Sequence, residues 1–354
     1  SLHDALPIWG KQMSLNLFLG QRLDGRNMYW ANAENAHISI LGQSGTGKTY
    51  LISRLAKEAC RQGFDVVIPD YSDSFLQMQD ARALHTDIRE INLDILSNSK
   101  GRDVDARAEG LVSSVMLFCK IGIAKQNTIR QLTVSFLQEN NTDETVPELI
   151  SYCKKQLKAS AETEMIRNCL GLLAPISTDI DTHIPIRQPG IIHIIRFPYW
   201  MGSDQRLRYT EMILAQVWNE QLCPFKAFKP VIFVLDEAHN LHLGSRNMGT
   251  RILREGRKYG ISGWFITQWA DDDKMLNTLS QAALRIFFRP GVENIESLAK
   301  TLAHGNRKKA LQYRQMIASM PVGSFFFFNA SGDAVYAKNT NTNQIHEGGN
   351  YNDS

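Results

Sequence analysis

The sequence of 354 residues is poor in the features that would place it in a special class of protein. It has no run that approaches the roughly 18 consecutive apolar residues of a membrane-spanning helix. Its five cysteines are an odd number, lie far apart and form no CxxC pair, which favours reduced thiols over a disulfide framework. The net charge of +3 is too small to indicate a nucleic acid partner by itself. We therefore expect an ordinary globular protein of the cytoplasm.

Both ends of the sequence are set apart from the rest. Residues 1–8, SLHDALPI, resemble the translation of a common sequencing adapter, so we treat residues 1–12 as an artefact or leader and exclude them from fold reasoning. The native start is then Met13 or lies upstream of it. Residues 339–354 are polar and show no apolar periodicity, which predicts a disordered tail.

Short apolar runs alternate with amphipathic segments through most of the chain. This alternation predicts an α/β fold, in which a mainly parallel sheet is flanked by helices on both faces. The predicted strands are 37–42, 65–71, 191–197, 231–235, 262–267, 285–288, 323–328 and 334–337. The predicted helices are 48–61, 203–222, 246–259, 292–303 and 306–318.

Residues 95–184 have a different character, because apolar residues recur there at three- and four-residue spacing. This spacing predicts a helical insertion of about four helices, one of them starting at the capped sequence Thr145-Val-Pro-Glu148. Residues 13–94 and 185–338 would then form the two parts of one core domain.

The segment Gly42-Gln43-Ser44-Gly45-Thr46-Gly47-Lys48-Thr49 fits the P-loop pattern G-x-x-x-x-G-K-[ST] and lies between a predicted strand and a predicted helix. Glycines allow such a loop to turn its backbone N–H groups toward a phosphate at a helix N-terminus. We expect ATP to bind residues 42–50, up to Tyr50. Lys48 would reach the β- and γ-phosphates, and Thr49 would ligate Mg²⁺. The alternative is a chance glycine-rich turn.

The sequence VIFVLDEAHN supplies the partner motif, because four apolar strand residues precede two acids. Asp236 would help to hold Mg²⁺, and Glu237 would act as the general base on the attacking water. The alternative is two surface acids at a strand end. Gln268, at the end of another strand, is a candidate sensor of the γ-phosphate. Asp70 is either a water- or metal-positioning acid or a turn-forming residue in the sequence YSDS.

DEAH together with GxGKT also occurs in superfamily two helicases. Lys48 and Asp236 are 188 residues apart (236 − 48), a separation much longer than those helicases usually allow. No downstream QxxGRxGR-like motif is present. Both observations disfavour a superfamily two helicase.

The motifs GQSGTGKT, IPDYSDSF, LDEAHNL, REGRKYGI and ITQ, in this order, resemble instead the HerA/FtsK superfamily of DNA-pumping ATPases over about residues 30–338. That resemblance implies a RecA-like P-loop fold, a homohexameric ring and translocation along double-stranded DNA.

The resemblance also implies roles for individual residues. Lys48 and Thr49 match the Walker A positions, Asp236 and Glu237 match Walker B, and Gln268 matches the sensor. Arg257 lies in the GRK motif and Arg285 in the strand LRIFF, and each is a candidate for the arginine that acts on a neighbouring subunit's nucleotide. The DPHGEY-like sequence after the second strand is replaced by DYSDSF, so the role of Asp70 stays open.

We expect a ring motor that pumps double-stranded DNA, working with a nuclease or a transfer apparatus. The alternatives are a conjugation or type IV secretion ATPase that energises export at a membrane complex, and an ATP-dependent switch with little motor activity.

Overall fold

The computed structural model describes residues 15–32, 36–96, 103–139, 144–158, 160–174, 184–222, 229–241, 243, 247–268, 273–329 and 331–340. Its centre is a sheet of eleven described strands in the order β2-β1-β11-β10-β9-β3-β8-β7-β4-β6-β5. The strands are β1 Leu15–Gln21, β2 Asn27–Asn32, β3 Ile38–Leu41, β4 Asp65–Asp70, β5 Ala83–Asp87, β6 Ile192–Arg196, β7 Val231–Leu235, β8 Ile261–Thr267, β9 Leu284–Phe288, β10 Ser324–Phe328 and β11 Ala334–Lys338.

The seven strands from β9 to β5 in this order are parallel, and β10, β11, β1 and β2 extend the sheet in antiparallel fashion. The prediction of a mainly parallel sheet is therefore confirmed. Each predicted strand overlaps an observed one. β1, β2 and β5 lie outside the predicted strands.

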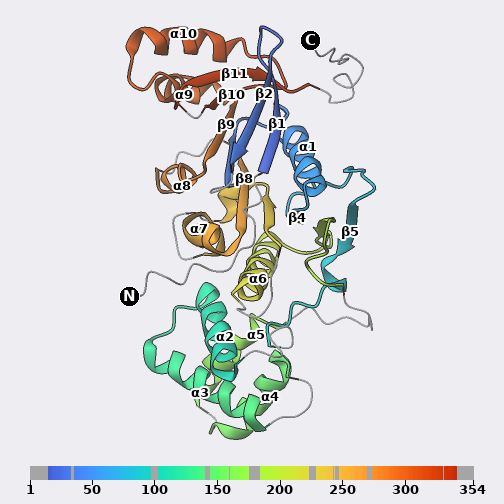
Figure 1. The fold of residues 1–354 in the computed structure, drawn as a ribbon. Coiled ribbons are helices and arrows are strands. Elements are labelled where there is room, and N and C mark those ends of the chain that lie inside the picture. The colour runs from blue at the N-terminus through green and yellow to red at the C-terminus, as the bar shows by residue number, and fades with distance from the viewer. Residues whose placement is uncertain are drawn as a thin grey trace, which may run out of the picture.

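Helices cover both faces of the sheet, as Figure 1 shows. The α-helices are α1 Lys48–Arg61, α2 Val104–Phe118, α3 Ile123–Glu139, α4 Val146–Gln156, α5 Ala161–Gly171, α6 Ser203–Gln221, α7 Met248–Glu255, α8 Asp273–Leu279, α9 Ile295–Leu302 and α10 Arg307–Ala318. One apolar core joins α1 to the sheet through Leu51, Ile52 and Leu55. A second joins α6 and α7 to the opposite face through Ile213 and Ile252. Burial on both faces explains why the central strands are continuous apolar runs.

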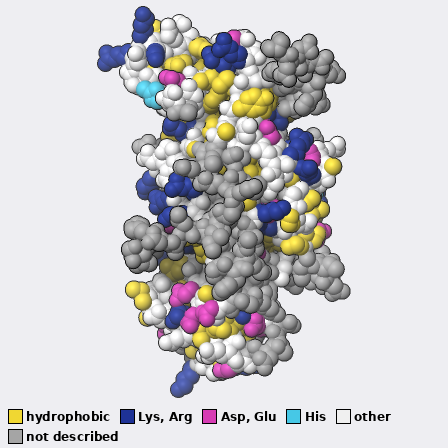
Figure 2. Space-filling model, in the orientation of Figure 1, with side chains coloured by type: hydrophobic (Ala, Val, Ile, Leu, Met, Phe, Trp, Pro, Cys, Tyr) yellow, Lys and Arg dark blue, Asp and Glu magenta, His cyan; other side chains and the backbone are white. Residues whose placement is uncertain are grey.

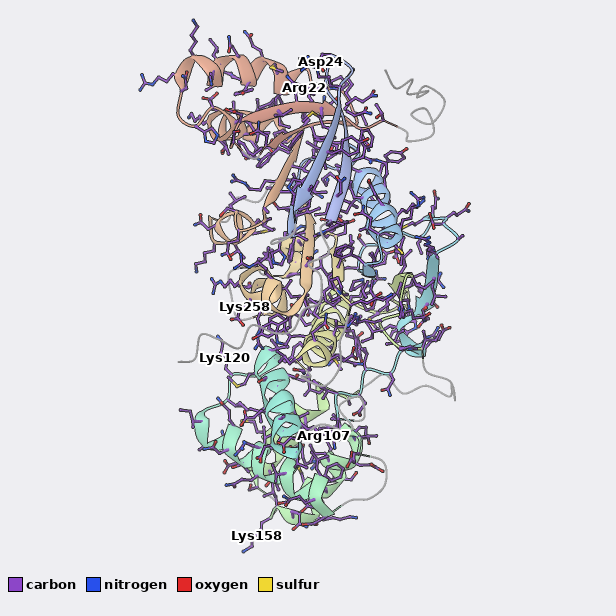
Figure 3. The ribbon with its side chains drawn as sticks, in the orientation of Figure 1. Arg22, Asp24, Arg107, Lys120, Lys158 and Lys258 are labelled. Atoms are coloured by element: carbon purple, nitrogen blue, oxygen red, sulfur yellow. The ribbon has the colours of Figure 1, made fainter. Side chains whose placement is uncertain are left out.

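The region predicted as a helical insertion contains α2 to α5, which lie together at one end of the molecule (Figure 1) around an apolar core of their own. Thr145 caps α4 as predicted, since its side chain accepts from the backbone N–H of Glu148. Arg107 points into this helical unit (Figure 3), where its guanidinium donates to the Leu96 carbonyl at 2.9 Å and pairs with Glu144 at 2.7 Å. The domain boundaries remain a prediction.

Two predicted helices are shorter than expected. In the region 246–259, α7 ends at Glu255 and a 3-10 turn, Gly256–Tyr259, follows, because the chain must reverse at Gly260 to enter β8. In the region 292–303, a 3-10 turn, Val292–Asn294, precedes α9. Within the described residues, no helix combines the length and apolar character that crossing a bilayer requires.

Candidate functional site

The carboxyl ends of four neighbouring strands bring the predicted motifs to one edge of the sheet. Leu41 at the end of β3 pairs with Thr267 of β8 and with Phe287 of β9, and Leu235 of β7 pairs with Phe265 of β8. The residues that follow these strands therefore lie at nearly the same level. In an open α/β sheet this edge is where ligands bind.

The P-loop leaves β3 in a conformation that its glycines make possible. Gly45 has φ 75° and Gly47 has φ 106°, in the left-handed region that side chains disfavour. A Cβ on Gly42 would lie only 2.5 Å from the Cβ of Phe288, so β9 also requires a glycine there. The Gly42 N–H donates to the Thr267 carbonyl at 3.3 Å, and the Gln43 N–H donates to the Arg289 carbonyl at 2.9 Å. The loop is thus fastened to both neighbouring strands.

Gln43, Ser44 and Gly45 form the exposed crest of the loop, and no side chain caps the N-terminus of α1 directly behind it. A helix N-terminus with unpaired N–H groups attracts an anion. Thr46 is buried and stabilises the loop from inside, because its Oγ1 donates to the Gln43 carbonyl at 2.7 Å.

The side chain of Lys48 folds back onto the P-loop. Its Nζ donates to the Gly42 carbonyl at 2.7 Å and to the Gln43 carbonyl at 3.0 Å. Burial lowers the pKa of Lys48, and the negative charges of Asp236 and Glu237 partly offset that effect. The lysine and the two carboxylates are therefore close enough to interact electrostatically, as the predicted chemistry requires.

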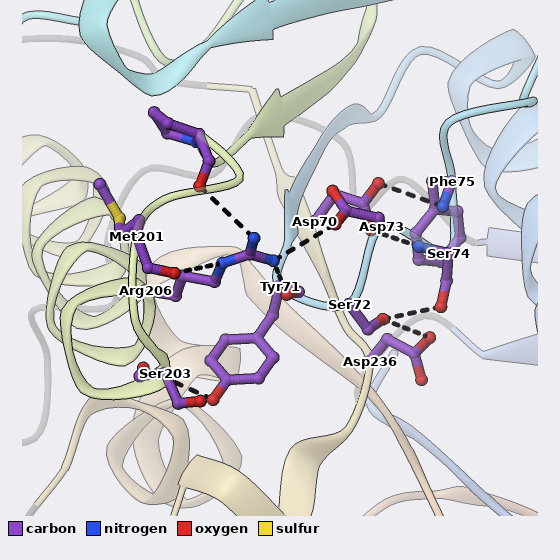
Figure 4. Close-up of polar contacts among 11 residues, drawn as sticks. Asp70, Tyr71, Ser72, Asp73, Ser74, Phe75, Met201, Ser203, Arg206 and Asp236 are labelled. Carbon is purple, nitrogen blue, oxygen red and sulfur yellow. Dashed lines mark hydrogen bonds and ion pairs between the residues drawn. The ribbon is translucent and has the colours of Figure 1, made fainter.

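The carboxylate of Asp236 is held on both sides. Its Oδ2 accepts from Ser72 Oγ at 3.2 Å, as Figure 4 shows. Its Oδ1 accepts from the Glu237 N–H at 2.8 Å. Glu237 has φ 49°, a strained value for a residue with a side chain, and strain of this kind gathers at functional sites. Its Oε2 lies 3.2 Å from His239 Nδ1. Asp236 is thus fixed by two hydrogen bonds, whereas the carboxylate of Glu237 contacts His239.

Thr49 and Tyr50 lie in the first turn of α1, where the Thr49 side chain is half-buried and Tyr50 is 55% exposed. Gln268 directly follows Thr267 and is exposed at the level of Gly42. These residues fit a magnesium nucleotide: Thr49 and Asp236 offer the oxygen ligands that Mg²⁺ prefers, beside a loop that a Cβ at Gly42 would distort.

Asp70 takes the turn-forming role. Its carboxylate is fully buried and accepts from the N–H of Ser74 at 2.9 Å and of Phe75 at 3.1 Å (Figure 4). Burial raises its pKa to about 6, although these two hydrogen bonds act in the opposite direction. Both carboxylate oxygens are used to close the loop after β4.

The two candidate arginines do not lie at this edge of their own chain. Arg257 precedes β8, which runs seven residues, or roughly 23 Å, to the P-loop edge. It acts electrostatically on His37, at the start of β3. Figure 3 shows its neighbour Lys258 beside α7, on the side that faces the helical unit. Arg285 is the second residue of β9, level with Ser39, and its guanidinium lies 4.6 Å from the Phe328 ring centroid.

Two features of the site have weak signals or none in the sequence. Arg289 directly follows β9 and offers its carbonyl to the P-loop, a position that the apolar run before it could have indicated. Ser72 contacts Asp236 from a loop 164 residues away along the chain, which no motif spacing reveals.

The parallel sheet, the loop between β3 and α1 and the two acids after β7 together define a RecA-like P-loop ATPase. A family model described as "Helicase HerA, central domain" matches residues 31–195. Together with the motifs, this match confirms the predicted resemblance to the HerA/FtsK superfamily. No curated protein matches the sequence significantly.

Solved structures agree with this fold. VirB4 of Thermoanaerobacter pseudethanolicus matches with a TM-score of 0.63 and 16% identity, covering 94% of this chain and 98% of that one. The bacterial conjugative coupling protein TrwBdeltaN70 matches with a TM-score of 0.55 and 14% identity, covering 91% and 88%. A TrwB complex with a non-hydrolysable GTP analogue gives 0.54 and 15%, covering 87% and 86%. At these identities the likeness establishes the fold.

Proposed function

We propose that this chain hydrolyses ATP with Mg²⁺ and uses the energy to translocate double-stranded DNA, as a homohexameric ring in the cytoplasm. The main support for ATP hydrolysis is that the P-loop, Asp236 and Glu237 meet at one edge of the sheet. Lys48 lies close enough to both acids to interact with them electrostatically. The match to the central domain of a helicase, HerA, supports the DNA substrate.

The residues of the site divide the work of hydrolysis. The P-loop N–H groups and Lys48 would bind the phosphates, with the Lys48 ammonium leaving its two carbonyl partners for the anion. Thr49 and Asp236 would hold Mg²⁺, which neutralises charge on the phosphates when bound. Glu237 would accept the proton of the attacking water, and Gln268 would contact the terminal phosphate from the neighbouring strand end.

Exposed basic residues offer contacts to the DNA backbone. Arg307, Lys308 and Lys309 begin α10 and are all exposed, and the end of the molecule that carries α10 shows a cluster of Lys and Arg side chains in Figure 2. Three cations in the first turn oppose the helix dipole. A bound polyanion would offset this unfavourable interaction with the helix dipole. Contacts of such residues with phosphates supply most of the non-specific affinity for DNA. Lys274, in α8, is a further candidate contact.

The test is the rate of ATP hydrolysis by the full chain without DNA, with double-stranded DNA and with single-stranded DNA. The proposal requires stimulation by the duplex and displacement of a triplex-forming strand from it in the presence of ATP. Lys48→Ala protein is the control for contaminating hydrolases. Hydrolysis that no DNA alters, in protein shown to be folded, would contradict DNA translocation while leaving the ATPase intact.

A second candidate is a conjugation or secretion ATPase that energises export at a membrane complex. It is favoured by the structural likeness to VirB4, which extends over 98% of that chain, and to the conjugative coupling protein TrwB. The two candidates separate in a co-purification experiment on the native host. Recovery of membrane-embedded transfer components supports export, and recovery of a nuclease supports DNA processing.

A further inference from the structure

Ser72 and Arg206 link Asp236, the proposed Mg²⁺ ligand, to the loop of residues 197–202. We propose that they are positioning residues: Ser72 orients Asp236, and Arg206 couples the loop that carries Ser72 to the aromatic segment 197–202. This proposal rests on the proposed function, because it concerns how Asp236 is oriented in the same nucleotide site and how that orientation is coupled to residues 197–202.

The hydrogen bonds around Ser72 have a defined direction. Ser72 Oγ lies 3.2 Å from Asp236 Oδ2 and 2.7 Å from Ser74 Oγ (Figure 4). A hydroxyl has one proton, and the Asp236 carboxylate can only accept, so Ser72 donates to Asp236 and Ser74 donates to Ser72. Since the Glu237 N–H engages the other oxygen, both oxygens of Asp236 have fixed partners. Hydrogen bonds of this kind to a carboxylate that ligates a metal fix its orientation.

The loop that carries Ser72 is closed from its base. Asp70 accepts from the N–H groups of Ser74 and Phe75, and Phe75 is 1% exposed in the core beneath the loop. Asp73 has φ 57° in the turn. Because both ends of the turn are fixed, the position of the Ser72 hydroxyl depends on whatever holds the middle of the turn.

Arg206, in the first turn of α6, holds the middle of this turn. Its Nη1 donates to the Tyr71 carbonyl at 2.8 Å and contacts Asp73 Oδ2 at 3.4 Å. The same guanidinium reaches the segment 197–202, since Nε donates to the Met201 carbonyl at 3.1 Å and Nη2 to the Pro198 carbonyl at 3.4 Å (Figure 4). One rigid, planar fork thus spans two loops, which a lysine cannot reproduce.

The segment 197–202 presents two aromatic side chains to solvent. Tyr199 is 94% exposed and Trp200 is 54% exposed, and both line a hollow of about 440 Å³ with Arg196 and Arg89. Trp200 lies between the two residues whose carbonyls Arg206 holds. A shift of the loop that carries Ser72 should therefore move the segment around Trp200 through the side chain of Arg206. The fluorescence of Trp200 should report that shift.

Magnesium affinity tests the Ser72 part. In a Glu237→Gln background, which retains nucleotide, binding of a fluorescent ATP analogue is titrated with Mg²⁺. Ser72→Ala should shift the Mg²⁺ midpoint about 10-fold or more toward weaker binding, as expected when a metal ligand loses a hydrogen-bond partner. Ser72→Thr should restore it, and Ser280→Ala, which removes an exposed serine hydroxyl elsewhere, should not change it. An unchanged midpoint in Ser72→Ala overturns the assignment.

Tryptophan emission tests the Arg206 part. The difference between the parent and its Trp200→Phe variant isolates the Trp200 signal, which should change when the magnesium nucleotide binds. Arg206→Ala should abolish the change, and Arg206→Lys should recover little of it. Arg26→Ala, which removes an exposed arginine between β1 and β2, should preserve it. Persistence of the change in folded Arg206→Ala protein overturns the coupling. A parent that binds no magnesium nucleotide at all would instead refute the proposed function.

Discussion

Lys48 and Glu237 meet at the same edge of the sheet, and the roles proposed for them can be separated by mutation. Lys48→Ala removes the charge that neutralises the terminal phosphates, so we expect it to abolish nucleotide binding. Glu237→Gln keeps the size and polarity of the side chain and loses only the base, so it should bind ATP and hydrolyse it about 10²–10⁴-fold more slowly. Equilibrium binding and single-turnover hydrolysis measure the two effects. Near-normal turnover by Glu237→Gln would remove Glu237 from the role of base.

Glu211 is a buried acid outside the site. It lies on α6 and accepts from the Met248 N–H at 2.8 Å at the start of α7, a position that stabilises a carboxylate. Burial nevertheless dominates and raises its pKa from 4.5 to about 7. Between these two pH values the folded state retains a proton that the unfolded state has lost. The stability of the fold should therefore decrease as the pH rises from about 4.5 to 7, and change little through this group above 7.

Glu211→Gln should remove that dependence. The amide oxygen can still accept from Met248 and carries no charge to desolvate, so the variant should be more stable than the parent at pH 8, by roughly 3 kcal/mol at most. At pH 4 the two should differ little. Urea unfolding at both pH values gives the comparison, with the exposed Glu162→Gln as the matched control. A parent no less stable than the variant at pH 8 would contradict a raised pKa of Glu211.

At the scale of elements, local patterns predicted the strands that are buried on both faces. β3 and β7 are uninterrupted apolar runs, and α1 begins and ends at the predicted residues because the P-loop glycines fix its start. β5 was not predicted because it is an edge strand with one sheet neighbour, and most of its residues are only half-buried. β1 was not predicted because its place in the sheet depends on its pairing with β2 and β11. In the pairing with β11, Gln21 lies opposite Lys338, which is far away along the chain.

The first turn of α10 is the element that we expect to contact the DNA backbone. Replacing Arg307, Lys308 and Lys309 together by alanine should lower the log–log salt slope of DNA binding by up to about 2.7, since each phosphate contact contributes about 0.9. Affinity should fall for all sequences alike. The triple variant of Lys154, Lys155 and Lys158, at the opposite end of the molecule (Figure 3), is a matched control. Equal salt slopes for the two triple variants would exclude α10 from DNA contact.

Neither of the two arginines that the sequence predicted for the site lies in it. Arg257 lies at the far edge of the sheet, and Arg285 lies within β9, half-buried against Phe328. Burial lowers the pKa of Arg285. Motif spacing could identify the P-loop and Walker B because their residues are consecutive. It could not place the arginines, because their positions depend on the order of the strands in the sheet.

If the chain forms the proposed ring, mixing two inactive variants tests whether either arginine acts on the nucleotide of a neighbouring subunit. Arg285→Ala and Arg257→Ala proteins should bind ATP and hydrolyse it poorly, because the charge developing on the phosphoryl group needs a cation worth roughly 10³–10⁵ in rate. Mixing either protein with Lys48→Ala protein should restore some activity, since an intact P-loop then meets an intact arginine. Native mass spectrometry establishes that the rings are mixed. Mixed rings without any recovered activity would argue against a shared site.

The order of the strands also bears on how the protein is made. Ile38 of β3 pairs with Trp264 of β8 and with Leu284 of β9, and the Thr46 carbonyl of the P-loop accepts from the N–H of Gly323. A ribosome that adds about 5–20 residues per second therefore exposes the P-loop segment for roughly 10–60 s before its neighbours emerge. During this time the apolar strand β3 has no partner, so nascent chains should depend on chaperones and acquire affinity for nucleotide only near the end of synthesis.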